Sequence, residues 1–405
     1  MGLAGVAVIL LLAVLFSANR RAINLRIVLS ALALDAALAV FVLRTPIGQQ
    51  VIDALSGGVN AILAYSQAGI AMVFGRLATD TQFAVIFAVH VLPIVIFFSA
   101  LMAVLYHLRI MQMVVAGLGV ALQAIIGTKP VESLNAAANV FLGQTEAPLV
   151  VRPYLERLTG PQLFAIMVSG LASVAGTVLA AYVQIGADAK YLLAASFMSA
   201  PGGLLMAKLM MPDDKGGAEP ELKVSSILAE RSPNANVIMA AAVGAQDGLR
   251  LALNIGAMLI AFVGLIALFN GLVGGLGGLA GVPGLSLQGI LGWVFAPLMF
   301  LVGVPWAEAQ TAGAVFGQKL ILNEFVAFIE LARLEAELSP RTVAMLTFAL
   351  CGFANFSSIA ILLGGLGSLI PQRLSELARF GLRAVAAGSL SNLLSAALAG
   401  LVLSL

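Results

Sequence analysis

The chain has 405 residues, of which 61% are hydrophobic and only 10% are charged, whereas soluble globular domains carry about 25% charged residues. Apolar runs that approach the roughly 20 residues needed to cross a bilayer recur from one end to the other. The formal net charge is +2, and the basic residues form no single patch, so nucleic-acid binding is not expected. We therefore expect an all-α polytopic protein in the lipid bilayer of the cell (inner or plasma) membrane.

The apolar runs predict eight transmembrane helices. The first run, LAGVAVILLLAVLF, has arginines after it rather than before it, the reverse of a secretory signal, so we interpret it as an uncleaved span. With both termini outside, the cytoplasmic side holds fourteen lysines and arginines and the other side five, which agrees with the positive-inside rule. The predicted spans are residues 3–17, 25–43, 83–106, 162–183, 190–211, 237–270, 342–365 and 384–404.

Between these spans lie apolar segments that polar residues or glycines interrupt. The first, 47–75, is amphipathic, which is typical of a helix lying at the membrane interface. The glycine-rich stretch GLVGGLGGLAGVPG at 271–284 is expected to form a connecting bend rather than a helix-packing surface. MPDDKGGAEPELKVSS is expected to be a loop. The other interrupted segments are 110–126, 128–158, 286–302 and 304–335.

An internal repeat relates two of these regions. Glu146 and Glu324 each lie at a break in an apolar segment, and each is followed by a turn, a span, a second turn and a final span. Glu146 precedes Pro161 by fifteen residues and Glu324 precedes Pro340 by sixteen. Counting the spans between the two units gives them opposite orientations. Inverted repeats with interrupted helices are typical of secondary transporters, so each break is predicted to be the tip of a re-entrant hairpin.

Polar residues at the two tips, and in the middle of the spans SGLASVAG and GFANFSSI, predict one shared cavity. Carboxylates accept hydrogen bonds from hydroxyl groups, and amide side chains both donate and accept. No Lys or Arg is assigned to the cavity, so an anionic solute is disfavoured. A neutral solute rich in hydroxyl and amide groups is expected, and Phe353 offers an apolar face for a flat ring. The predicted members are Gln144, Thr145, Glu146, Glu324, Asn355 and Ser358.

The motifs GQTEAPLVVRPY, LNEFVA and CGFANFSSIAI, in this order and spacing, closely resemble the concentrative nucleoside transporters over roughly residues 80–405. The resemblance implies a cation-coupled homotrimer of eight-span protomers, each with two hairpins, interfacial helices, a scaffold and a transport domain that moves like an elevator. The expected substrate is a uridine-like nucleoside. The GQTEAP form, with an Asn just ahead, resembles the sodium-coupled branch, so Na+ is the expected coupling ion, and no other cofactor is expected.

The resemblance also implies roles for individual residues. The residues implied to contact the nucleobase are Gln144, Thr145, Glu146 and Val178. Those implied to hold the ribose are Glu324, Asn355 and Ser358, with Phe353 lining the pocket. The implied Na+ ligands are Asn139, Leu142, Ser173 and Val174. These ligands would act largely through backbone oxygens, which suit a hard cation.

Four predicted parts follow from the repeat and the resemblance together. Residues 1–106 are expected to form scaffold spans with an interfacial helix. Residues 110–212 are expected to form the first repeat, with hairpin 1 and two spans of the transport domain. Residues 213–285 are expected to contain a loop and a long scaffold or trimerisation helix. Residues 286–405 are expected to form the second repeat, with hairpin 2 and two further spans of the transport domain.

Other functions stay open at this point. A proton-coupled nucleoside symporter would keep the fold and the substrate, and a sodium symporter of free nucleobases would not need the groups assigned to the ribose. A channel fits less well, because the hairpin tips block the midplane from both sides. An intramembrane enzyme is the least supported: there is no H-E-x-x-H motif, and the two histidines and one cysteine give no metal site or Cys-His pair.

A few other polar residues are predicted to have structural roles. Asp35, in the middle of the second span, is expected to hydrogen-bond within the scaffold rather than to act on a substrate. His90 and His107 are too isolated for a metal cluster, and Cys351 is expected to be a small buried residue. Glu308 is expected to cap the helix that begins hairpin 2.

Overall fold

The computed structural model describes residues 2–80, 86–213, 234–279, 281 and 284–404. Its regular elements are helices, and the described residues contain no strand, which confirms the all-α class. Seven of the described helices are long and apolar enough to cross a membrane. From residue 214 onward the predicted loop lies outside the described residues, as do the first residues of the predicted span at 83–106.

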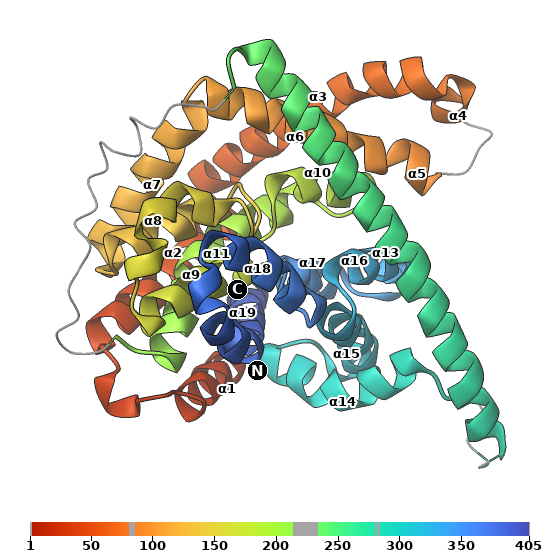
Figure 1. Cartoon of the computed structure of the whole chain (residues 1–405). Helices are drawn as coiled ribbons and strands as arrows, with labels where there is room; N and C mark the ends of the chain where they lie inside the picture. Colours follow the sequence, from red (N-terminus) through yellow and green to blue (C-terminus); the bar gives the residue numbers. More distant parts are fainter. Residues whose placement is uncertain (1, 81–85, 214–233, 280, 282–283, 405) are drawn as a thin grey trace.

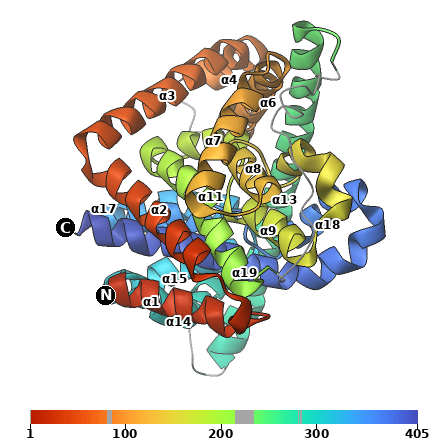
Figure 2. The same cartoon turned by 90° about the vertical axis from the view of Figure 1, so that its left-hand side faces the viewer.

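The N-terminal helices pack against the end of the chain. Helix α1 (Gly2–Leu15) has only 14 residues, fewer than the roughly 20 that a vertical span requires. It lies along α19 (Leu374–Leu403), where a Cβ at Gly2 would be 3.4 Å from the Cβ of Leu401. The two ends of the chain therefore lie side by side (Figures 1 and 2), and the side of the membrane that they face stays a prediction.

A short turn η1 (Arg20–Ala22) leads into α2 (Leu25–Arg44), which meets the 29-residue α3 (Pro46–Phe74) at a tight corner. Pro46 suits the first turn of α3, and the Thr45 hydroxyl accepts a 3.0 Å hydrogen bond from the amide of Gly48. The interfacial segment predicted at 47–75 is thus one continuous helix, whose position in the bilayer stays a prediction.

The longest helix, α13 (Val237–Leu279), runs along one edge of the molecule (Figure 1) and packs on α6 (Leu92–His107). The contact is close, because a Cβ at Gly248 would lie 2.7 Å from the Cα of Ile96. The expected bend at 271–284 is wrong in its first part, since the helix continues to Leu279. Glycines lower helix propensity but keep the amide donor, and no proline interrupts this stretch before position 283. The short helices α4 (Arg76–Thr79) and α5 (Phe87–His90) precede α6.

The two predicted repeats have the same order of elements, and each contains a broken span. The first repeat breaks at 173–175 and the second at 351–356. The first comprises α7 (Ile110–Ile126), α8 (Pro130–Asn139), η2 (Ala147–Arg157), α9 (Gly160–Ala172), α10 (Gly176–Gln184) and α11 (Ala189–Met210). The second comprises α14 (Leu287–Val302), α15 (Trp306–Ile321), α16 (Glu324–Leu334), η3 (Glu335–Glu337), α17 (Pro340–Leu350), α18 (Ser357–Leu369), η4 (Pro371–Arg373) and α19. Helices α14 and α15 meet at 117°.

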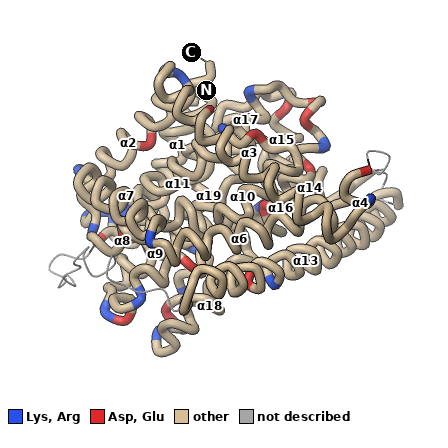
Figure 3. Tube along the Cα trace, turned by 90° about the horizontal axis from the view of Figure 1, so that it is seen from above, with Lys and Arg blue, Asp and Glu red and all other residues tan. Residues whose placement is uncertain are grey.

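Charged residues lie mainly toward the edges of the molecule (Figure 3). One buried exception joins hairpin 1 to the last helix of its repeat. The ammonium of Lys208, at the end of α11, lies 2.6 Å from the Glu132 carboxylate on α8 and 2.5 Å from Asp213. The second Glu132 oxygen accepts a hydrogen bond from the amide of Lys129 at the start of α8. Each charge in this cluster is therefore compensated, as burial requires.

Candidate functional site

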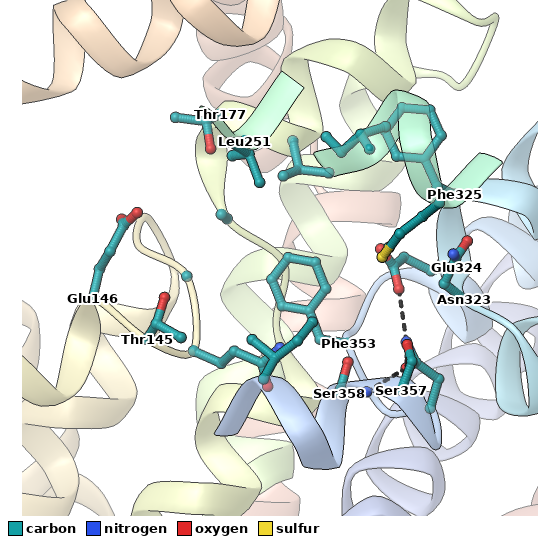
Figure 4. A pocket seen from close by; sticks show the side chains of 18 of the residues that line it. Thr145, Glu146, Thr177, Leu251, Asn323, Glu324, Phe325, Phe353, Ser357 and Ser358 are labelled. Atoms are coloured by element: carbon teal, nitrogen blue, oxygen red, sulfur yellow. Dashed lines mark hydrogen bonds between the residues drawn. The ribbon is translucent and has the colours of Figure 1, made fainter. Parts of the chain in front are cut away.

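The hairpin tips and the broken spans meet around one cavity (Figure 4). One wall comes from tip residues 143–146, and the opposite wall comes from residues 323–325. The breaks contribute residues 175–178 and 353–358, and α13 closes the cavity with the side chains of Leu251, Ile255, Met258 and Leu259. The structure places all eight predicted substrate residues on this lining: Gln144, Thr145, Glu146, Val178, Glu324, Phe353, Asn355 and Ser358. Their individual contacts with a substrate stay predictions.

The second tip positions Glu324 through a helix cap. The Asn323 side chain accepts a 2.9 Å hydrogen bond from the amide of Val326, which starts α16 immediately after the tip. Glu324 therefore lies in the first turn of a helix, where the free amide groups favour a negative side chain. Only 6% of Glu324 is exposed. The tip thus presents one carboxylate to the cavity from a defined backbone position.

Both oxygens of that carboxylate are held by neighbouring side chains. The Tyr182 hydroxyl donates to Oε1 at 3.0 Å, and the Asn355 amide donates to Oε2 at 2.9 Å. The Asn355 side-chain oxygen Oδ1 accepts in turn from the Ser357 hydroxyl at 2.7 Å and from the Ser358 backbone amide at 2.8 Å. Figure 4 shows the part of this network that lines the cavity, around Glu324 and Ser358, on the side opposite Thr145 and Glu146. The second tip and the second break therefore form one preorganised network.

The first tip is built differently. Gln144 is 4% exposed, and its Oε1 atom has no hydrogen-bond partner among the described residues. The tip can approach α9 closely because position 170 is glycine, where a Cβ would lie 2.9 Å from the Gln144 Cβ. The returning arm η2 is a 3-10 helix, and Pro148 and Pro153 remove two of its amide donors.

The predicted Na+ ligands lie where two helices end side by side. Helix α8 ends at Asn139 and α9 ends at Ala172, and the carbonyl groups at such ends lack partners within their helices and carry partial negative charge. Asn139 is 1% exposed; its Nδ2 donates to the Asn135 carbonyl at 3.0 Å, whereas its Oδ1 has no partner among the described residues. The predicted ligands Asn139, Leu142, Ser173 and Val174 are all buried.

An orphaned amide oxygen between two helix C-termini suits a cation that prefers oxygen ligands. The described residues contain no group of three or more His, Cys, Asp or Glu side chains that could hold a metal ion. Any cation in this region must therefore rely on amide, hydroxyl and carbonyl oxygens. The Ser173 hydroxyl donates to the Ser169 carbonyl at 3.1 Å, and its own carbonyl accepts from the Phe353 amide at 3.1 Å. The two breaks thus share a backbone hydrogen bond.

A buried lysine, which the sequence analysis left without a role, ties the ends of both broken spans together. The Lys319 ammonium on α15 is fully buried and donates to the Ala349 carbonyl at 2.8 Å and to the Asn392 side-chain oxygen at 2.7 Å. Asn392 then donates to the Ala172 carbonyl at 2.7 Å and to the Cys351 carbonyl at 3.0 Å. A positive charge thereby faces helix C-termini, the favourable arrangement.

Several lining residues were missed for identifiable reasons. Tyr182 is not on the lining itself but donates to the lining residue Glu324. It lies one helical turn beyond Val178 on the same face of α10, so its spacing was an available signal. Its ring also stacks on Phe328 at a centroid distance of 4.3 Å. The α13 residues gave no signal, because that helix is apolar on every side. The other missed lining residues include Thr177, Asn323, Phe325 and Ser357.

The remaining polar predictions have mixed outcomes. Glu308 lies in the first turn of α15, but its carboxylate accepts hydrogen bonds from the amide and hydroxyl of Ser339 at 3.3 and 2.9 Å, so it links hairpin 2 to the start of α17. Cys351 is buried, as expected. The hydrogen bond expected for Asp35 is wrong, since neither carboxylate oxygen has a partner among the described residues. The sequence could not show this, because it does not give the packing of α2 on the distant helices α11 and α19.

Interrupted helices that meet around a polar cavity define the class of secondary transporters. Three family models match the chain: "Na+ dependent nucleoside transporter N-terminus" over residues 4–77, "Nucleoside recognition" over 88–189 and "Na+ dependent nucleoside transporter C-terminus" over 191–400. The chain therefore belongs to the concentrative nucleoside transporter family, as its motifs suggested.

Relatives with curated names agree with this assignment. The nucleoside permease NupC of Helicobacter pylori is 45% identical, and the alignment covers 99% of this chain and 97% of that protein. The mouse sodium/nucleoside cotransporter 1 is 38% identical, with 98% of this chain and 63% of that protein covered. Among solved structures, CNTnw in an inward-facing substrate-bound state is 48% identical with a TM-score of 0.94, covering 100% of this chain and 97% of that chain.

Proposed function

We propose that this protein is a Na+-coupled symporter that carries nucleosides into the cell. The observation that carries the proposal is the cavity between the two tips, where a preorganised carboxylate network faces side chains with free hydrogen-bonding capacity. The lining contains no Lys or Arg, which supports a neutral substrate. The related proteins named as nucleoside permeases and cotransporters support the same substrate class.

In the proposed complex, the ribose hydroxyls contact Glu324, Asn355 and Ser358, because a carboxylate and an amide accept hydrogen bonds from vicinal hydroxyls. The base lies between Phe353 and the first tip, where Gln144 and Glu146 reach its polar edge. The order of the lining supports this orientation, since Phe353 projects between the two polar walls (Figure 4). A uridine-like nucleoside offers both the hydroxyl pair and the amide edge that this arrangement needs.

Na+ is proposed at Asn139, Leu142, Ser173 and Val174. The orphaned Asn139 oxygen and the two helix C-termini support a cation there, and the family description specifies Na+ dependence. A membrane potential of about 100 mV contributes ~2.3 kcal/mol per charge, and a tenfold Na+ gradient contributes ~1.4 kcal/mol. One Na+ per nucleoside would therefore sustain roughly 500-fold accumulation.

The proposed transport step is elevator-like and takes place in a homotrimer at the inner or plasma membrane, with both termini outside. The exposed apolar surface of α13 supports a contact with lipid or with other copies of the chain, since Ile260 is 80% exposed and Leu276 is 66% exposed. The proposed transport unit comprises the two repeats, residues 110–212 and 286–405, which carry both tips and both breaks.

The test is uptake of radiolabelled uridine into proteoliposomes that contain the purified protein. An inward Na+ gradient alone is expected to drive accumulation, whereas an inward proton gradient alone is not. Accumulation driven by protons but not by Na+ would support the proposed substrate and contradict Na+ as the coupling ion. Uptake of free uracil in place of uridine would instead support the nucleobase symporter.

A further inference from the structure

Asp35 is the one buried carboxylate in the described chain that the proposed function leaves without a role or a partner. It lies near the middle of α2, is 0% exposed, and neither Oδ1 nor Oδ2 has a hydrogen-bond partner among the described residues. An ionised carboxylate without compensation in a membrane interior is costly by several kcal/mol. Something that carries a positive charge must therefore accompany it.

The surroundings of Asp35 supply further oxygen atoms that could bind such a group. Helix α2 packs here on α11 and α19, and the residue of α11 that faces Asp35 is Gly202. A methyl group at Gly202 would lie 2.7 Å from the Ser391 Oγ, 3.3 Å from the Asp35 Oδ2 and 3.8 Å from the Ser395 Oγ. Three oxygens from two helices are thus grouped around the space that the missing side chain leaves.

Two further details make this space rich in acceptors. The Ser391 hydroxyl is fully buried, and like Asp35 it has no hydrogen-bond partner among the described residues. Pro201, inside α11, has no amide donor for the carbonyl of Phe197, so one backbone acceptor on the same helical turn also lacks its usual partner. Carboxylate, hydroxyl and carbonyl oxygens are the ligands that hard monovalent and divalent cations prefer.

No lysine or arginine in the described part of the chain pairs with this carboxylate. The charged side chains on the helices packed against α2 have other partners within the described chain. Lys190 pairs with Asp53, Lys208 pairs with Glu132 and Asp213, Arg373 pairs with Glu376, Arg379 lies over the Phe380 ring, and Arg383 donates to the Phe16 carbonyl. Of the tyrosines on these helices, Tyr65 is exposed and Tyr191 packs on Phe348. The compensating charge must come from solution.

We infer that Asp35, Ser391 and Ser395 form a second monovalent-cation site beside Gly202, separate from the one proposed at Asn139, which binds Na+ or a proton. The site joins α2 to the last helix of each repeat, α11 and α19, and so lies where both repeats meet the N-terminal region. The inference concerns ion binding in the absence of nucleoside and therefore does not depend on the proposed substrate.

The test is thermal unfolding of the purified full-length protein in detergent, without nucleoside. Asn139→Ala/Ser173→Ala serves as the background, because it weakens Na+ binding at the other proposed site. A ligand that binds only the folded state raises the melting temperature. If the bound ion is Na+, we expect the melting temperature of this background to be higher in Na+ than in choline. We expect Asp35→Asn in the same background to abolish this difference.

If the bound ion is a proton, the melting temperature of the background in choline falls as the pH rises, because the protonated folded state loses its extra stability, and Asp35→Asn removes this dependence. Gly202→Ala separates the two ions: its methyl group fills the space that Na+ needs, but leaves the carboxylate free to bind a proton. Gly203→Ala is the control, since its Cβ would contact Ala172 at 3.2 Å rather than these oxygens.

The inference is overturned if Asp35→Asn folds and changes neither the Na+ response nor the pH response of the background. Should Asp35→Asn not fold, Ser391→Ala and Gly202→Ala replace it. The inference is equally overturned if Ser391→Ala changes neither the Na+ response nor the pH response of the background and Gly202→Ala leaves the Na+ response unchanged.

Discussion

The two hairpin tips face the same cavity, yet they hold their polar side chains in different ways. At the second tip, both oxygens of Glu324 accept hydrogen bonds from Tyr182 and Asn355. At the first tip, by contrast, Gln144 Oε1 has no partner among the described residues. One wall is fixed before a ligand arrives, and the other keeps free hydrogen-bonding capacity.

This difference matches the chemistry of the proposed substrate. The sugar hydroxyls are the constant part of a nucleoside, so a fixed network recognises them without further ordering, which lowers the entropic cost of binding. The base edges vary in their donors and acceptors, and an amide side chain whose oxygen has no partner among the described residues is able to meet more than one pattern. Substitutions at the two tips should therefore have different effects on stability and on transport.

The largest effect is expected for Glu324→Gln. The new amide group places a donor against Tyr182 or Asn355, which already donate, and hydrogen bonds to a charged group contribute about 1.5–3 kcal/mol each. We expect uridine uptake in proteoliposomes to fall at least ~100-fold and the melting temperature to drop, with trimer assembly unchanged by chemical crosslinking. Tyr182→Phe, which removes one donor and keeps the ring, should lower uptake ~10-fold. Normal uridine uptake by a well-expressed Glu324→Gln variant would contradict the proposed contact between Glu324 and the ribose.

Lys319→Met tests whether the hydrogen bonds of Lys319 behind both breaks stabilise the fold. Loss of the ammonium leaves the Ala349 carbonyl and the Asn392 side-chain oxygen buried and unsatisfied, at about 1–3 kcal/mol each. We expect a clearly lower melting temperature in detergent. The matched control is Lys190→Met, whose ammonium is exposed and pairs with Asp53, so its loss should cost no more than about 1 kcal/mol. Equal melting temperatures for both variants would contradict a structural role for Lys319.

Asn139→Ala and Ser173→Ala probe the ion beside the first tip. The Na+ concentration for half-maximal uptake should rise about tenfold in Asn139→Ala, which corresponds to ~1.4 kcal/mol, and less in Ser173→Ala. Asn60→Ala on α3, an exposed position far from the cavity in sequence, is the control. An unchanged Na+ response in both variants would place the ion elsewhere.

The smallest effect is expected for Gln144→Ala. Since Gln144 Oε1 has no protein partner, its removal should leave the melting temperature of the nucleoside-free protein unchanged. Uptake should weaken only a few-fold, because one neutral hydrogen bond contributes about 0.5–1.5 kcal/mol, and the loss should differ between nucleosides. The two tips would prove equivalent if thermal unfolding showed the same destabilisation for Gln144→Ala and Glu324→Gln.

The sequence was sufficient to predict part of the cavity lining. Glu146 and Glu324 are costly in an apolar segment, and their matching positions before Pro161 and Pro340 identified two related breaks. These signals lie within short segments, so they can be recognised in the sequence without knowledge of the tertiary packing. The helical class and the positions of most apolar helices followed from composition and length for the same reason.

Packing contacts between distant segments could not be predicted from the sequence. Lys319 is 30 residues from Ala349 and 73 residues from Asn392, and one of these partners is a backbone carbonyl that any residue type would provide. The glycines before Leu279 were expected to bend the chain, because composition alone does not distinguish a weak helix from a turn. Asp35 was expected to find a partner, and only the arrangement of α2, α11 and α19 reveals that it has none.

The hydrogen bond from the Phe353 amide to the Ser173 carbonyl joins the proposed ion site to the aromatic wall of the cavity. In the proposed function, a movement of either break would therefore change the contacts of both the Na+ ion and the nucleoside. Linkage is reciprocal, so the factor by which Na+ raises the affinity for a nucleoside must equal the factor by which that nucleoside raises the affinity for Na+. A single backbone hydrogen bond would thus couple the binding of Na+ to the binding of the nucleoside.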